Sequence, residues 1–404
     1  MKKKQLTYVA LVSGLLLHTG CAQREFIPEI ESNEAIELQI SPRVSLTRSV
    51  IQSGTQNGGS GQMTNIAVCA SGNDYTDAGK NNDYALYTWK LDNINNTWQS
   101  GADHKIYLTG EEATIYAYYP AYKPGNDHEY ATIDALKPTN SAIPVTVYEG
   151  TATEATYTID CTTNNADKVW SINKWENNTN AGLRNSAPGE VDYMWATAVN
   201  KVSNKNGNNV TLNMNHALSL LTFRVYNNGT YTGTGALAQV KLEDAKNSAT
   251  RLYKTPAADC TMNITTGAIT GMSDADSDDN DATFIRAISN YTLVTQGAVD
   301  GETPPTDAAA ASKKFSILVF PATDIANGDV KATFTIDGTT YSVNLDAPTG
   351  TVTIGGNSVD TADKWLAGVN YQYTVRLSGT GLSISTISVT DWVDAPNGSD
   401  MDIQ

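Results

Sequence analysis

The chain has 404 residues, of which 43 are acidic and 27 basic, so its formal net charge is -16. This excess of negative charge excludes binding of nucleic acid through a basic face, because such a face needs clustered lysine and arginine. A single hydrophobic core rarely serves a chain of this length, and we therefore expect two domains.

The first residues have the pattern of an export signal. Residues 2–4 are lysines, and residues 6–17 are mostly apolar. The run is shorter than the roughly 20 apolar residues that span a bilayer, so residues 1–20 are predicted to be a signal peptide. It ends in Leu17-His18-Thr19-Gly20-Cys21, which is typical of bacterial lipoproteins, although His18 stands where leucine is usual. We expect acyl chains such as palmitate on Cys21; the alternative is an ordinary cleaved signal with a chance cysteine.

The rest of the chain alternates between apolar and polar residues, as strands with one buried face do. In residues 35–40 the apolar positions are Ile36, Leu38 and Ile40. Further strands are predicted at residues 115–119, 145–148, 220–226, 240–242, 316–320, 332–336, 341–345, 371–377 and 382–389. The step Asp337-Gly338 predicts a tight hairpin. No helical pattern separates these strands, so we expect an all-β fold made of sandwiches.

Residues that could form a catalytic or metal centre are scarce. The cysteines and histidines beyond the signal are Cys69, Cys161, Cys260, His104, His128 and His216. They form no CxxC, HExxH or other ligand spacing, and an odd number of cysteines leaves at least one thiol free. We therefore expect no enzyme, no metal and no cofactor. A Ser/His/Asp arrangement assembled from distant residues stays open.

Three weaker patterns favour structural interpretations. Residues 233–238 fit G-x-G-x-x-A, but a strand follows them, so a glycine-rich loop is favoured over a dinucleotide site. Asp274, Asp276 and Asp278 have the spacing of a calcium loop without its glycine and glutamate, which favours a solvated acidic loop over weak calcium binding. The aromatic run Tyr116, Tyr118, Tyr119 and Tyr122 could form a platform for sugar rings, but Tyr116 and Tyr118 share one side of a strand and Tyr119 lies on the other, so one set is expected to be core.

Several short segments occur in a characteristic order after the signal that ends at Cys21. They are residues 35–40, 47–48, 115–120, 192–196, 212–219, 318–321, 365–368, 371–375 and 389–392. Each is a loose pattern by itself, and their order and spacing carry the comparison. Together they resemble the fimbrillin family of Bacteroidales pili, the FimA-like and Mfa-like fimbrial lipoprotein subunits, over essentially the whole mature chain.

The resemblance implies two transthyretin-like β-sandwich domains in tandem, delivered to the cell outer membrane and then built into a fimbrium on the cell surface. It also implies an arginine-specific protease that cuts after Arg48, or less favourably after Arg43, and removes the lipidated segment with its first strand. The expected parts are residues 1–20 (signal peptide), 21–48 (lipidated segment), 49–205 (N-terminal sandwich) and 206–404 (C-terminal sandwich).

The freed sheet edge would accept a strand from another copy or a related fimbrial subunit. The donor strand expected in this chain contains Leu382, Ile384, Ile387 and Val389, with a break in alternation at residues 385–386. The alternative is a glycan-binding or adhesin lipoprotein that stays tethered to the surface and monomeric. Stalk, anchor and tip subunits share all of these features.

Overall fold

The structure of the protein is a computed structural model. It describes residues 35–44, 52–53, 62–63, 65–71, 83–90, 97–101, 105–121, 142–145, 147, 159–160, 192–245, 248–253, 260–272, 283–297, 308, 312–354 and 356–391. Several residues singled out in the sequence lie outside these ranges, namely Cys21, Arg48, His104, His128, Cys161, Asp274, Asp276 and Asp278.

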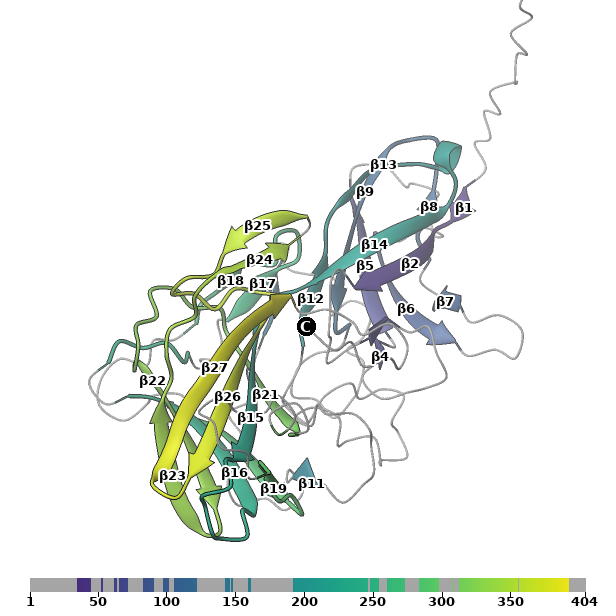
Figure 1. The fold of residues 1–404 in the computed structure, drawn as a ribbon. Helices are drawn as coiled ribbons and strands as arrows, with labels where there is room; N and C mark the ends of the chain where they lie inside the picture. Colours follow the sequence, from purple (N-terminus) through teal and green to yellow (C-terminus); the bar gives the residue numbers. More distant parts are fainter. Residues whose placement is uncertain are drawn as a thin grey trace, which may run out of the picture.

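The described chain is all-β, as predicted, with one short 3-10 turn, η4 (Asn204–Asn206), among its named elements. Its largest sheet has eight strands in the order β2-β14-β12-β9-β5-β6-β7, with β13 beside β9, and occupies the upper right of Figure 1. The strands are β2 (Gln39–Val44), β5 (Asn65–Ser71), β6 (Tyr84–Lys90), β7 (Thr97–Ser100), β9 (Ala113–Tyr119), β12 (Met194–Ala196), β13 (Val199–Val202) and β14 (Asn209–His216).

This eight-stranded sheet curls until its two edges approach each other. The hydroxyl of Ser100, on the edge strand β7, donates a 2.7 Å hydrogen bond to Oε1 of Glu37, two residues before β2 begins. The hydroxyl of Tyr87, on β6, donates a 2.8 Å bond to the carbonyl of Leu38. The curl encloses one face of the sheet, which explains why β14 alternates between buried and exposed residues.

Two further sheets lie at the lower left of Figure 1. One has the order β20-β15-β26-β27, with β21 also beside β15, and the other has the order β11-β19-β16-β22-β23. The strands of the first are β15 (Ser219–Asn227), β20 (Val294–Thr295), β21 (Lys314–Val319), β26 (Val369–Ser378) and β27 (Gly381–Asp391). Those of the second are β11 (Ile159–Asp160), β16 (Leu237–Asp244), β19 (Thr283–Ser289), β22 (Val330–Ile336) and β23 (Thr339–Asn344).

These two sheets pack face to face as a β-sandwich. The ring of Phe223, on β15, meets Phe334, on β22 of the opposite sheet, edge to face at 6.0 Å between centroids. It also stacks at 5.6 Å on Tyr373 of the neighbouring strand β26. Strand β15 lies inside its sheet and is buried on both faces apart from Arg224, and its apolar residues accordingly fall on both faces.

Four smaller sheets complete the described strands. They are β1 (Ile36–Glu37) with β8 (Tyr107–Leu108), β3 (Gln52–Ser53) with β4 (Gln62–Met63), β24 (Thr351–Ile354) with β25 (Asn357–Asp360), and β10 (Ala142–Pro144) with β17 (Thr261–Asn263) and β18 (Ile269–Thr270). β10 and β11 precede the expected boundary near residue 205, yet they pair with β17 and β19, which follow it.

The passage from the curled sheet to the sandwich comes later than residue 205. β14 follows η4 but still pairs within the curled sheet, and β15 begins the sandwich after only Ala217 and Leu218. Buried side chains of the two parts form one contiguous cluster. Strand pairing therefore places the change of sheet at residues 217–218.

Most predicted strands lie where the alternation indicated. The Asp337-Gly338 hairpin joins β22 and β23, and both turn residues have positive φ angles, 50° and 76°, as such tight turns require. Of the strand predicted at residues 145–148, the structure describes Val145 and Val147, and neither lies in a named strand. The paired segment is β10, and Val145 follows it and donates its N–H to the carbonyl of Cys260.

Candidate functional site

The first described strands lie where the two edges of the curled sheet approach each other, and residues 36–44 are called the seam segment. β1 pairs antiparallel with β8, while β2 pairs in parallel with β14, from Gln39 opposite Asn209 to Val44 opposite Met214. Between them the N–H of Leu38 donates to the carbonyl of Ile106 at 2.8 Å. One short segment thus hydrogen-bonds to two separate parts of the fold.

The inner face of the seam segment is apolar. Leu38 is fully buried, Ile40 is 5% exposed, and Pro42 is also buried. Burying a side chain of this size stabilises a fold by about 1.5–3 kcal/mol. Ile36, predicted to share this buried face, is instead exposed, because the chain changes hydrogen-bonding partner at Leu38. The strand also extends beyond residue 40, to Val44.

Polar side chains hold the start of the seam segment. The ammonium of Lys105 lies 2.6 Å from Oε2 of Glu37, and Ser100 donates to Oε1 of the same carboxylate. The amide of Asn208 donates to the carbonyl of Glu37 at 2.9 Å. The hydrogen bond to Glu37 raises the pKa of Lys105, so the lysine remains charged in this pair.

The two candidate cleavage sites have different surroundings. Arg43 is exposed, but its backbone lies within β2, opposite Asn213 of β14. A protease needs extended chain that is free of other partners, so cutting after Arg43 requires β2 to leave β14 first. Arg48 and Cys21, where we expect lipid attachment, lie outside the described residues.

The expected donor strand corresponds to β27, which ends its sheet and pairs antiparallel with β26. A β-bulge interrupts this pairing: Val375 lies opposite Ile384 and Thr374 opposite Thr386, so Ser385 is the extra residue. Its hydroxyl donates to the carbonyl of Thr374 at 3.0 Å. The bulge accounts for the break in alternation, since it returns the later apolar residues to the same face.

That face rests on the sandwich core. Its members, all half-buried and packed against the core, are Leu382, Ile384, Ile387 and Val389. Thr386 and Ser388, which alternate with the last two, are exposed. The seam segment and β27 therefore resemble each other, because each contains an edge strand with one apolar face. They belong to different sheets.

The residues considered for other chemistry have structural roles. Tyr118 is 3% exposed and Tyr116 packs partly against the core, so Tyr118 cannot stack on a sugar. His216 is buried with its Nδ1 atom 2.9 Å from Asp192 Oδ1. Within the described residues, no three His, Cys, Asp or Glu side chains are grouped to hold a metal.

Within the glycine-rich segment at 233–238, residues 233–236 form the predicted loop, and the last two residues already belong to β16. Its backbone N–H groups at Gly235 and Ala236 donate to the carboxylate of Asp337 at 2.8 and 2.9 Å, and Tyr231 adds its hydroxyl at 2.9 Å. These N–H bonds hold the pKa of Asp337 below its usual range. Donors that a phosphate would need are thus occupied by a side chain of the protein.

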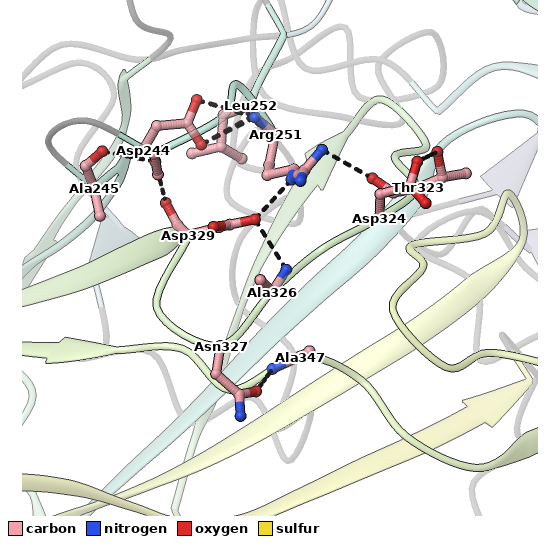
Figure 2. Close-up of polar contacts among 11 residues, drawn as sticks. Asp244, Ala245, Arg251, Leu252, Thr323, Asp324, Ala326, Asn327, Asp329 and Ala347 are labelled. Carbon is pink, nitrogen blue, oxygen red and sulfur yellow. Dashed lines mark hydrogen bonds and ion pairs between the residues drawn. The ribbon is translucent and has the colours of Figure 1, made fainter.

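A second polar cluster, which the sequence did not reveal, joins three loops of the sandwich (Figure 2). The guanidinium of Arg251 donates to Asp329 at 2.8 Å and to the carbonyl of Thr323 at 3.1 Å. Asp244 accepts the N–H groups of Arg251 and Leu252. Burial raises the pKa of Asp329, but the N–H of Ala326 and the Arg251 guanidinium outweigh it and leave the pKa lowered.

These features define an all-β protein whose first and last described strands both lie at sheet edges. Residues 47–392 match the fimbrillin-like family, and the chain belongs to that family. Membership assigns it to the fimbrial proteins of the cell surface, whose subunits assemble with one another. A comparison with curated proteins found no match. Within the described residues, no helix is long and apolar enough to cross a membrane.

Solved structures to which the chain is similar include three bacterial proteins. A putative cell adhesion protein from Bacteroides uniformis is 17% identical, with 89% of this chain and 99% of that chain covered and a TM-score of 0.49. One from Bacteroides ovatus is 16% identical, with 90% and 99% covered and a TM-score of 0.48. The tip fimbrial protein Mfa3 from Porphyromonas gingivalis is 9% identical, with 88% and 100% covered and a TM-score of 0.38.

Proposed function

We propose that the chain is a fimbrial subunit that reaches the outer membrane as a lipoprotein anchored through Cys21, is cut after Arg48, and then joins other subunits by strand exchange. The seam segment is the observation that carries this proposal. It is short, lies at a sheet edge, and hydrogen-bonds to β8 on one side and β14 on the other.

Loss of the seam segment would leave a groove with strong affinity for a replacement strand. The apolar sites of Leu38 and Ile40 would open to water, and the backbone groups of β14 that now pair with β2 would lose their partners. Unpaired edge groups beside an apolar groove are what β-strand addition fills. Cleavage thereby turns a closed subunit into an acceptor.

Arg48 is the proposed cleavage site because it follows the seam segment, whereas Arg43 lies within its paired part. Cutting after Arg48 separates Cys21, and with it the lipid anchor, from the rest of the chain. The anchor would thus serve delivery, and the cut would free the subunit and open its seam in one step.

The proposed parts of the mature chain are a lipidated segment at 21–48 and two sandwich-type halves. The proposed donor strand is β27. β27 pairs with β26 alone among the described strands, so its outward movement breaks one set of hydrogen bonds. Its half-buried residues Leu382, Ile384, Ile387 and Val389 would refill an apolar groove in the next subunit.

Arginine-specific proteolysis of the purified full chain tests this function. Mass spectrometry should show a new N-terminus at residue 49, and gel electrophoresis without boiling should then show a ladder of polymers. Arg48→Lys should block both the cut and the ladder, whereas Arg43→Lys should leave both intact. An uncut chain, or a cut chain that stays monomeric at high concentration, would refute the proposal.

A further inference from the structure

The seam segment is held by two kinds of contact that differ in what they demand of its sequence. Tyr87 and Asn208 donate to the backbone carbonyls of Leu38 and Glu37, and these acceptors exist in any strand. The contacts of Lys105 and Ser100, in contrast, are made to the side-chain carboxylate of Glu37. Only the second kind can distinguish one strand from another.

Glu37, Lys105 and Ser100 form what is called here the charged end of the seam. The carboxylate uses both oxygens, at 2.6 Å from the ammonium and 2.7 Å from the hydroxyl. The side chains of Lys105 and Glu37 are 33% and 27% exposed, so water screens the pair only in part. Glu37 directly precedes Leu38, the most deeply buried residue of the seam segment.

A strand that replaces the seam segment must satisfy the same groups. A neutral strand would restore the backbone bonds of Tyr87 and Asn208 but would leave Lys105 and Ser100 without the carboxylate that now joins them. An acidic residue one position ahead of the first buried apolar residue would restore all of these contacts.

The geometry points to a selective acceptor: we propose that the charged end of the seam favours a strand from another subunit that carries a carboxylate immediately ahead of alternating apolar residues. This inference rests on the proposed function, because strand exchange is what brings the foreign strand.

The chain's own β27 does not fit this requirement. Its sequence, GLSISTISVTD, contains a single acidic residue, Asp391, at its end. The residues next to Leu382, Ile384, Ile387 and Val389 are glycine, serine or threonine. A second copy of this chain can therefore refill the seam with β27, as the ladder of the purified chain requires, but a different fimbrial subunit with a carboxylate at that position is the preferred occupant.

Peptide capture by the full chain tests the selection. Three fluorescent peptides are compared: residues 35–44, the same peptide with Glu37→Gln, and residues 381–391. The receptor is the full chain carrying Glu37→Gln, so that its own seam segment is held less tightly. The acidic peptide should bind about fivefold more tightly than its Glu37→Gln version, the upper range for a partly exposed ion pair. Residues 381–391 should bind more weakly than the acidic peptide.

Two receptor variants assign any preference to Lys105. Adding Lys105→Met should make the first two peptides bind equally, and adding Lys105→Arg should restore the preference for the acidic one. Equal binding to the receptor that retains Lys105 would overturn the inference, and so would the absence of binding by all three peptides.

The peptide assay and the cleavage assay fail separately. A ladder after proteolysis combined with equal peptide binding leaves the proposed function standing and removes the selection. If the chain prefers the acidic peptide but never forms a ladder, the selection stands and the proposed function is refuted.

Discussion

Trp195 packs against Gly267 so closely that a methyl group on Gly267 would overlap the indole ring. Trp195 belongs to β12 of the curled sheet, whereas Gly267 lies in the turn between β17 and β18. Gly267 also has a φ angle of 70°, which L-residues with side chains rarely adopt. This contact ties a hairpin from the second half of the chain to the first sheet.

Gly267→Ala should lower the free energy of unfolding by about 2–4 kcal/mol, because it adds a steric overlap to backbone strain. Gly338→Ala is the matched control, since Gly338 has a φ of 76° and open space around it. Urea unfolding followed by tryptophan fluorescence measures both. Equal losses in the two variants would mean that Trp195 does not constrain the turn.

Leu38→Ala should cost about 2–5 kcal/mol, as expected for the truncation of a fully buried leucine. Ile36→Ala, two residues earlier and exposed, should change stability by less than about 0.5 kcal/mol. Hydrogen exchange at the amide of Gln39, which bonds to Asn208, should accelerate in the first variant alone. Similar exchange in both would argue against Leu38 as the main anchor of the seam segment.

Asp192→Ala should cost about 1–3 kcal/mol, because it removes the carboxylate that lies 2.9 Å from Nδ1 of the buried His216 imidazole. Replacing both partners with apolar residues, as in Asp192→Leu/His216→Leu, should recover part of the loss. Thermal unfolding of the single and double variants measures the coupling. Strictly additive losses would show that the pair does not act as a unit.

The stabilisation that Asp337 gives to the folded protein should be lost in acid. Backbone N–H groups lower its pKa in the folded state, so its stabilisation is complete above the unfolded pKa of about 3.9 and is lost as the pH falls through the lower folded value. Asp337→Asn should therefore reduce the fall in Tm below about pH 4. Tyr231→Phe, which removes one of several donors, should retain most of that fall.

Sequence patterns predicted the local features of this fold well. Period-two alternation located most strands, and Asp337-Gly338 located its hairpin. The exposure of Ile36 did not follow from alternation, because the seam segment changes partner within three residues. The Ser385 bulge appeared in the sequence only as an irregularity, since alternation shows a break without showing its geometry.

Pairing between distant strands could not be predicted. β2 with β14 and β15 with β26 are parallel pairs formed by strands far apart in the chain, and an alternating pattern does not specify its partner. The charged end of the seam depends on the same long-range arrangement, since Glu37 and Lys105 meet only after the sheet curls. The burial of Tyr118 likewise depends on β9 lying between β5 and β12.

The direct passage from β14 to β15 has a mechanical consequence. Only Ala217 and Leu218, both buried, separate the strand that borders the seam from the strand inside the sandwich sheet. Tension applied to a strand seated beside β14 would reach β15 along covalent backbone, without passing through an extended linker. A fibre joined at such seams would resist stretching at each subunit until whole rows of hydrogen bonds broke together.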